Sequence, residues 1–285
     1  MDCIDALLRF LRLEGPKPAL YGWVHFLFLA LVAAVTVFLC FKFRDCPDRV
    51  FRRILFAGWI LIVVLEIYKQ AAFIGFQGEP GNYHWDYQWY AFPFQFCSAP
   101  LYVLPFIIFC KPGKVRDACM AFMTTFSLFA GLSVCAYPGD VFSVFVGINA
   151  QTMAHHGLQV VFGIFIAVYN RRRVGFRWYL SALPVFGVLA GIAMLLNWLV
   201  PLWFSREQTF NMFFISWRFP STLPIMSAMY QDVHHPNVPY PVALLIYFAG
   251  FLLAAWIVFA VLFALIRRTE KRAREPQAAE KGVNG

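Results

Sequence analysis

The sequence predicts an all-α fold: a polytopic membrane protein built as a seven-helix transmembrane bundle, with its N-terminus outside and its C-terminus in the cytoplasm. Composition is the first reason. Of the 285 residues, 61% are hydrophobic and only 14% are charged, whereas soluble domains average about 45–50% apolar and about 25% charged residues. The second reason is that apolar runs of roughly 20 residues, enough to cross a bilayer, recur along the chain. A soluble globular protein is therefore excluded.

Seven apolar runs are the expected membrane spans. They are Leu20–Phe41, Ile54–Phe76, Tyr90–Cys110, Ala118–Tyr137, Val141–Tyr169, Trp178–Phe204 and Val242–Ile266. Residues 1–19 precede them as an amphipathic segment with Ile4, Leu7, Leu8 and Leu11 on one helical face, which suits the membrane surface. Residues 20–266 form the predicted seven-helix membrane domain. Residues 267–285 form a basic cytoplasmic tail.

Positive charge sets the predicted orientation. The net charge is +9, and 18 of the 24 Lys and Arg residues fall in alternate loops and the tail. This asymmetry follows the positive-inside rule and argues against nucleic acid as the partner. The basic loops are placed to touch anionic lipid instead. We expect an integral, multi-pass protein of a bacterial inner or plasma membrane.

Cysteine and histidine spacing does not indicate a metal or a cofactor. The seven cysteines include no CxxC pair. His234 and His235, with Asp232, lie in a predicted loop without further acids or thiols, so a surface role fits them better than metal binding. A retinal protein is disfavoured because Lys69, in the second run, is the only lysine inside a predicted span.

Polar side chains gather in the outer half of the predicted bundle. Since polar groups at bilayer depth usually face the bundle interior or a cavity, a one-sided set indicates a cavity open to the outside. Glu66 and Lys69 lie three residues apart on one helical face, where they form either a structural ion pair or one wall of a pocket. The other members are Gln70, Gln77, Gln95, Cys97, Ser98, Asn149, Gln151, Thr152, His155, His156, Gln159 and Asn197.

The fifth run carries two adjacent histidines. Asn149, Thr152, His156 and Gly163 share one helical face, whereas His155 points about 100° away from it. This stripe favours His156 as the histidine that faces a pocket. The structural alternative is a hydrogen bond between helices.

Cys97 lies between prolines in the third run. A thiol becomes a nucleophile when a histidine lies within hydrogen-bond reach, and His156 is expected at comparable depth. Pro93 and Pro100 free backbone groups that are candidate oxyanion donors, as are Gln95, Ser98 and Asn149. A kinked structural helix and a plain ligand pocket remain open as alternatives.

Three segments resemble a known family. FPFQFCSAPLYVLPF resembles the LPLHLCS-type motif of the YwaF-like bacterial integral membrane proteins, with Gln95 where that motif has His. HHGLQVVFGIFIAVY resembles that family's fifth-span helix, and LNWLVPLWFSREQTFNMFFISWRFPSTLPIM, which holds Asn197 and Asn211, resembles its outer segment. The family is similar to a eukaryotic transmembrane acyltransferase family that moves fatty acyl chains between phospholipids with a Cys and a His. More distantly, it is similar to androgen-induced hydrolases that use Thr and His.

The resemblance implies a function and its residues. It implies a lipid acyltransferase or hydrolase with Cys97 as the nucleophile and His156 as the base, or His155 if the register slips by one. The partners are then membrane phospholipids and lysophospholipids, without a cofactor or metal. The alternatives are a small-solute transporter or lipid-binding protein using Glu66, Lys69 and Asn197, and a structural subunit. The expected substrate-binding residues are Gln95, Ser98, Asn149, Thr152, Glu66, Lys69, Asn197 and Asn211.

Overall fold

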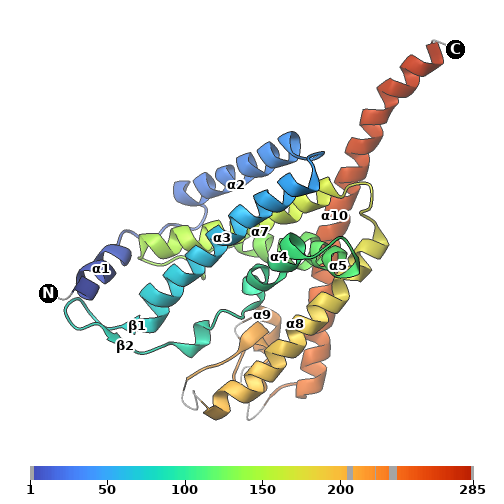
Figure 1. Ribbon diagram of the computed structural model, residues 1–285. Coiled ribbons are helices and arrows are strands. Elements are labelled where there is room, and N and C mark those ends of the chain that lie inside the picture. Colours follow the sequence, from blue (N-terminus) through green and yellow to red (C-terminus); the bar gives the residue numbers. More distant parts are fainter. Residues whose placement is uncertain (1–2, 204–207, 222, 231–235, 284–285) are drawn as a thin grey trace.

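The computed structural model describes residues 3–203, 208–221, 223–230 and 236–283, and helices dominate them (Figure 1). The α-helices are α1 (Cys3–Leu11), α2 (Trp23–Lys42), α3 (Asp48–Lys69), α4 (Ala99–Phe109), α5 (Lys114–Phe122), α6 (Leu128–Ala136), α7 (Val146–Tyr169), α8 (Phe176–Trp203), α9 (Pro224–Tyr230) and α10 (Tyr240–Val283). Two π-helical segments, η1 (Gln70–Gly75) and η4 (Met123–Ser127), continue α3 and join α5 to α6. Short 3-10 turns are η2 (Trp89–Ala91), η3 (Phe96–Ser98) and η5 (Met212–Phe214). The strands β1 (Phe76–Gln77) and β2 (His84–Trp85) pair antiparallel.

Five helices of the described chain are long and apolar enough to cross a membrane. They are Trp23–Lys42, Lys114–Ala136, Val146–Tyr169, Phe176–Trp203 and Tyr240–Lys271. They match the first, fourth, fifth, sixth and seventh predicted runs, so the all-α membrane class is confirmed. The count of seven and the orientation of the termini stay predictions. The second predicted run is helical through the rest of α3 and η1. Helix α3 itself begins before that run with Asp48, Arg49 and Arg52, which lower its hydropathy.

The third predicted run, Tyr90–Cys110, is wrong as a continuous helix. The chain is irregular up to Gln95, and only the 14 residues of Phe96–Phe109 form an apolar helix. At about 1.5 Å rise per residue it measures about 21 Å, less than the roughly 30 Å of hydrocarbon. Pro93 explains the late start, because proline lacks an N–H and disfavours helix in the residue before it. Pro100 falls in the first turn of α4, where a missing N–H is tolerated.

Helix α7 lies at the centre of the fold and packs against α2, α3, α6 and η4. Glycines permit the closest approaches. A Cβ on Gly131 of α6 would lie 2.7 Å from the carbonyl oxygen of His156, and one on Gly163 of α7 would lie 2.8 Å from Cβ of Leu128. Helix α2 lies at the edge of the bundle, and α10 extends beyond the other helices (Figure 1).

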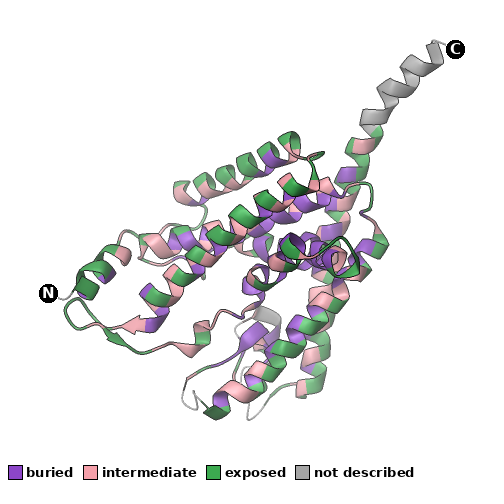
Figure 2. Cartoon of the chain, in the orientation of Figure 1, coloured by how far each residue is buried: buried purple, intermediate pink, exposed green. Residues whose placement is uncertain are grey.

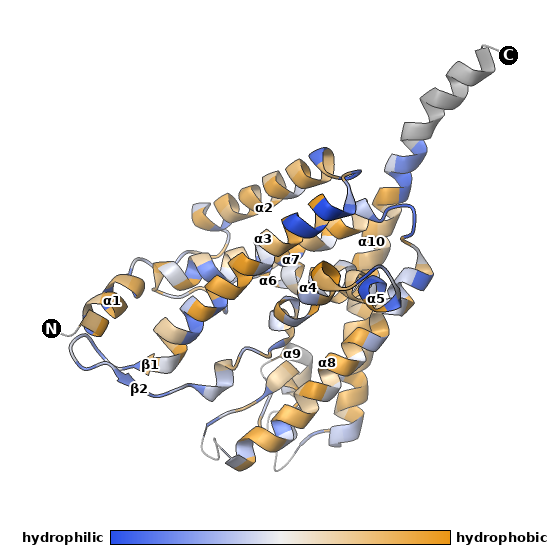
Figure 3. Cartoon of the chain, in the orientation of Figure 1, coloured by the Kyte–Doolittle hydropathy of each residue, from blue (hydrophilic) through white to orange (hydrophobic). Residues whose placement is uncertain are grey.

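The exposed surfaces of the outer helices are apolar. Figure 2 shows exposed residues along α2, α8 and α10, and Figure 3 shows the same helices largely hydrophobic. Phe38, Leu195 and Leu253, one from each helix, are all at least half exposed. A protein surface of this kind is compatible with hydrocarbon and not with water. The outer faces of these helices therefore contact lipid.

Ion pairs tie together the Arg-rich ends of several helices. Arg171, after α7, pairs with Asp45 at 2.5 Å and with Glu270 of α10 at 2.8 Å. Asp48 pairs with Arg116 at 2.5 Å and with Arg52 at 2.7 Å. The hydrogen bond from Arg171 lowers the pKa of the Asp45 carboxyl. These contacts hold the loops of the basic end in place.

The opposite end is held by the N-terminal segment. The guanidinium of Arg12 donates to the carbonyl of Ala72 at 2.5 Å and also to that of Phe76. The hydroxyl of Tyr68 donates to the carbonyl of Leu11 at 2.7 Å. The segment after α1 is therefore bound to the η1–β1 region through hydrogen bonds.

Candidate functional site: a cysteine–histidine pair in an apolar cavity

Cys97 lies at the N-terminus of the helical segment Phe96–Phe109. The backbone N–H groups of Phe96 and Cys97 donate to no backbone carbonyl in the described part of the chain. Unpaired N–H groups and the helix dipole favour negative charge at this end. Thiolates are stabilised at helix N-termini for the same reason. The helix N-terminus thus acts in favour of a thiolate at Cys97, whereas burial of the side chain in the apolar interior acts against one.

Two side chains of α7 bind the backbone of Cys97. Its carbonyl oxygen lies 2.9 Å from Nε2 of His155 and accepts a hydrogen bond from Nε2 of Gln159 at 2.8 Å. A carbonyl only accepts, so His155 carries its proton on Nε2. The two residues are one helical turn apart, which puts them on one face of α7. His155 therefore positions Cys97 through the main chain, and Gln159, expected only to border the pocket, does the same.

His156 has the protonation pattern of a general base. Its Nδ1 lies 2.8 Å from the carbonyl oxygen of Thr152. Because that oxygen can only accept, Nδ1 holds the proton and Nε2 is left as the basic nitrogen. The backbone of Thr152, rather than its hydroxyl, orients the ring. The side chain of Thr152 instead donates to Gln151 at 3.3 Å.

Cys97 and His156 line the same cavity, which has a volume of about 500 Å³. This volume falls within the range of about 300–1,000 Å³ typical of small-molecule sites. The wall is apolar apart from Cys97, His156, Ser133 and Tyr247, and it comes from α6, α7, α10, η3 and the segments around Phe214 and Met226. The apolar members are Phe96, Phe129, Ala130, Val134, Val141, Phe214, Leu223, Met226, Ile246, Gly250, Phe251 and Ala254.

A charged pair lies near this site. Nζ of Lys69 lies 2.8 Å from Glu66 Oε1, and the Gln70 amide donates to the same oxygen at 2.7 Å. Oε2 of Glu66 has no partner in the described chain. Lys69 is close enough to interact electrostatically with Cys97 and both histidines. Its positive charge favours a thiolate at Cys97, whereas Glu66 opposes one.

Two of the other expected substrate-binding residues form hydrogen bonds with the backbone of loops. Asn149 accepts from the N–H of Ser143 and donates to its carbonyl, both at 2.8 Å. Asn197 forms the same two-bond pattern with Met212, at 2.6 and 2.9 Å. Ser98 is buried, and its N–H donates to the carbonyl of Gln95 at 2.8 Å. Asn149, Thr152, Asn197 and Asn211 are not among the residues that line the Cys97 cavity.

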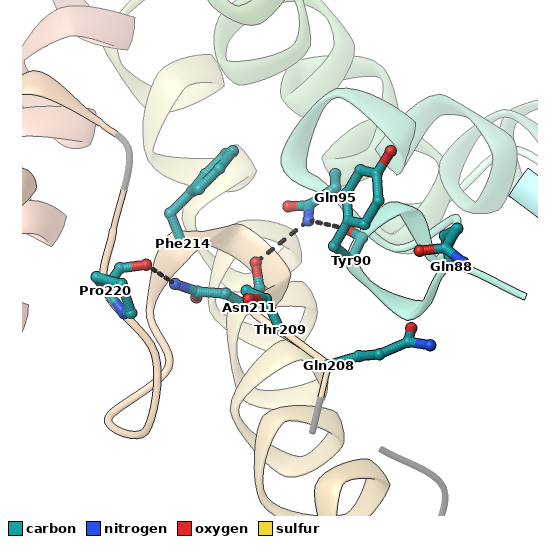
Figure 4. A pocket seen from close by; sticks show the side chains of 8 residues that line it. All are labelled: Gln88, Tyr90, Gln95, Gln208, Thr209, Asn211, Phe214 and Pro220. Atoms are coloured by element: carbon teal, nitrogen blue, oxygen red, sulfur yellow. Dashed lines mark hydrogen bonds between the residues drawn. The ribbon is translucent and has the colours of Figure 1, made fainter. Parts of the chain in front are cut away.

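Gln95 and Asn211 border a second, smaller pocket of about 380 Å³ (Figure 4). The Gln95 amide donates to the carbonyl of Asn211 at 3.2 Å and accepts from the N–H of Phe213 at 3.2 Å. Asn211 in turn donates to Pro220 at 3.0 Å. Phe214 lines both pockets.

Metal chemistry and the state of the cysteines are the remaining points. His234, His235 and Asp232 lie outside the described residues. The described residues contain no group of three or more His, Cys, Asp or Glu side chains placed to hold a metal. Cys97 and Cys135 are both free thiols. Sequence reasoning missed Tyr247, a tyrosine within an apolar run that lines the Cys97 cavity.

These features define an α-helical integral membrane protein with a thiol and an imidazole at an apolar cavity. The chain belongs to the TMEM164 family, whose model matches residues 20–267. No curated protein matches the chain, and no solved structure does. The family suggested by the sequence motifs, the YwaF-like proteins, is not the one that matches. That expectation is confirmed only as far as a family of transmembrane proteins, and a bacterial membrane stays a prediction.

Proposed function

We propose that the protein is a lipid acyltransferase or hydrolase that uses Cys97 as its nucleophile and His156 as its base. The observation that carries the proposal is the apolar cavity lined by both residues. An apolar cavity can bind the acyl chain of a lipid, and a thiol with a basic imidazole can attack the ester that carries the chain. The motif around Cys97, which resembles that of the Cys–His acyltransferases, supports the same chemistry.

The first half-reaction forms a thioester. Nε2 of His156 takes the thiol proton, and the thiolate of Cys97 attacks the ester carbonyl carbon of a phospholipid. The N–H groups of Phe96 and Cys97, which donate to no backbone carbonyl in the described chain, stabilise the oxyanion. When the tetrahedral intermediate collapses, the carbon–oxygen ester bond breaks. The imidazolium then gives its proton to the departing lysolipid oxygen.

The second half-reaction releases the acyl chain. His156 removes a proton from an acceptor hydroxyl, whose oxygen attacks the thioester carbonyl. The carbon–sulfur bond breaks and the sulfur is reprotonated by His156, which restores the starting enzyme. The acceptor is a lysophospholipid in transfer and water in hydrolysis. Apolar walls exclude water and favour transfer.

The test uses purified protein in vesicles with acyl-labelled phospholipid and unlabelled lysophospholipid. We expect label to move to the lysolipid with the wild-type protein and to stay in place with Cys97→Ala or His156→Ala. Cys135→Ala is the matched control, because Cys135 is also a free cysteine and, although it is buried, it does not line the cavity. Equal transfer by all four proteins would remove Cys97 and His156 from the mechanism.

A solute-binding or transport role is the second candidate. The observation in its favour is the buried carboxyl of Glu66, with one oxygen unpartnered in the described chain and Lys69 beside it. Asn197, expected to complete that site, is instead fully engaged with Met212. Solute uptake into proteoliposomes that is lost in Glu66→Gln and retained in Cys97→Ala would favour this role.

A further inference from the structure

The Cys97 cavity and the smaller pocket share segments of the chain. The smaller pocket, called the polar pocket below, is lined by Gln88, Tyr90, Gln95, Gln208, Thr209, Asn211, Phe214 and Pro220 (Figure 4). Gln95 lines this pocket, whereas the next two residues, Phe96 and Cys97, line the cavity. Phe214 lines both. The two spaces are therefore adjacent at Phe214.

The two spaces differ in polarity. Apart from Phe214 and Pro220, every residue that lines the polar pocket carries a side-chain amide or hydroxyl. Tyr90, Thr209 and Pro220 are exposed. These residues come from the irregular segments around η2 and η5, and irregular backbone contacts water or protein rather than lipid. Water fills a polar space of this kind, whereas apolar cavities stay dry, so Phe214 lies where water comes close to the Cys97 cavity.

The backbone at Phe214 has an unfavourable conformation. Phe213 and Phe214 have φ values of 57° and 59°, in the left-handed region, which costs energy for residues other than glycine. Strained backbone persists where surrounding contacts impose it, and it is concentrated at functional sites. Side-chain amides supply those contacts here. Oε1 of Gln95 accepts from the N–H of Phe213 at 3.2 Å, and Asn197 holds Met212 through two hydrogen bonds.

Aromatic packing joins this turn to the segment that carries the thiol. The ring of Phe213 stacks on that of Phe94, with centroids 5.8 Å apart, and meets that of Phe96 edge to face at 5.4 Å. Phe96 directly precedes Cys97 in the chain. The strained turn is therefore tied to the Cys97 segment, and the backbone of Phe214 has a fixed position beside the cavity.

We infer that Phe214 separates the Cys97 cavity from the water of the polar pocket and so determines whether an acyl chain is transferred or hydrolysed. This inference rests on the proposed function and adds a specificity-determining residue to it. Water that reached the thioester would add its oxygen to the carbonyl carbon and break the carbon–sulfur bond. Its proton would pass through His156 to the departing sulfur of Cys97, and a free fatty acid would leave. Excluding water therefore favours transfer to an acceptor hydroxyl.

Replacing Phe214 by glycine removes the ring without adding backbone strain. Glycine adopts positive φ without a steric penalty, so Phe214→Gly should fold at least as stably as Phe214→Ala. Either change frees more than the roughly 30 Å³ that one water occupies. Phe129→Ala is the matched control. Phe129 is also a partly buried phenylalanine that lines the Cys97 cavity, but it is not among the described residues that line the polar pocket.

The first measurement requires no turnover. Full-length protein in lipid nanodiscs is treated with a quaternary-ammonium methanethiosulfonate, a charged thiol reagent that dissolves in water and not in hydrocarbon. Mass spectrometry follows modification of the Cys97 peptide. We expect the rate to rise about tenfold in Phe214→Gly and Phe214→Ala, which corresponds to about 1.4 kcal/mol, and to keep its wild-type value in Phe129→Ala.

The buried Cys135 reports unfolding in the same samples, so the rise must be confined to the Cys97 peptide. An unchanged Cys97 rate in both Phe214 variants would overturn the inference. An equal rise in Phe129→Ala, or a rise at Cys97 and Cys135 together, would overturn it as well.

The second measurement uses acyl-labelled phospholipid with unlabelled lysophospholipid and compares labelled free fatty acid with labelled phospholipid product. The ratio of hydrolysis to transfer should rise in both Phe214 variants by a factor similar to that of the labelling rate, and Phe129→Ala should keep the wild-type ratio. Turnover that requires Cys97, with an unchanged ratio in the Phe214 variants, would keep the proposed function and overturn this inference. The expected labelling pattern without any turnover would support the barrier at Phe214, and only the proposed function would fail.

Discussion

Gly131 lies where the packing of α6 against α7 directly affects the position of His156. It lies on α6, where the backbone of α7 passes so close that a Cβ would be 2.7 Å from the His156 carbonyl oxygen and 2.8 Å from Cβ of Gln159. Contacts below 3.0 Å require one of the two helices to move, because neither partner is the flexible end of a side chain. Gly131→Ala should therefore displace the turn of α7 that holds His156.

The expected magnitude follows from two opposing effects. Overpacking a tight site costs about 1–3 kcal/mol, whereas replacing glycine by alanine within a helix gains about 1 kcal/mol. Gly187→Ala on α8 has only the gain, since a Cβ there meets nothing within 4 Å. The two variants should therefore differ by about 1–3 kcal/mol in free energy of unfolding.

The assay is reversible unfolding of each variant in mixed detergent, followed by circular dichroism, with acyl transfer measured on the folded protein. We expect Gly131→Ala to unfold at lower denaturant than Gly187→Ala and to transfer acyl groups more slowly. If Gly131→Ala is as stable as Gly187→Ala, the close packing of α6 on α7 is not as described. That result would also remove the argument that this contact positions His156.

Two further predictions concern the ends of the bundle. Asn197→Ala should lower the free energy of unfolding by about 1–3 kcal/mol, because it leaves the buried N–H and carbonyl of Met212 unpaired, and thermal unfolding identical to wild type would contradict this. Burial raises the pKa of the Asp48 carboxyl, but hydrogen bonds from Arg116 and Arg52 outweigh this and lower it below 3.8. The folded state is therefore stabilised above that pH and loses the contribution as the pH falls through the lowered pKa. Asp48→Asn should flatten the acid side of the stability profile, and an unchanged profile would refute this assignment.

The sequence predicted the membrane class well, because it depends on regular features. The structure brings Cys97 and His156 to one cavity, and their catalytic pairing stays a prediction. Apolar runs report lipid contact directly, and helical periodicity places His156 on an inward face. The prediction of a continuous helix for the third run was wrong, because hydropathy does not indicate where a helix is interrupted. Pro93 is the available signal in the sequence, because a proline both frees backbone groups and delays the start of the helix.

The amides were harder to interpret. Asn149 and Asn197 are polar residues of the kind found in binding sites. The side-chain amide of each instead forms two hydrogen bonds with the backbone of one loop residue. An amide that both donates and accepts serves equally well for a ligand or a peptide group. The partner is fixed by tertiary placement of the loops, which periodicity does not encode. Tyr247 is the opposite case: it lines the Cys97 cavity, but its position within an apolar run does not indicate this.

The most direct measurement is the mass of the Cys97 peptide after the protein meets phospholipid. We expect rapid acid quenching of the wild-type protein to yield a peptide carrying one acyl chain on Cys97, sensitive to neutral hydroxylamine as a thioester is. His156→Ala should yield much less of it, and the Cys135 peptide should stay unmodified. An unmodified Cys97 peptide in a preparation that is transferring acyl groups would contradict the account.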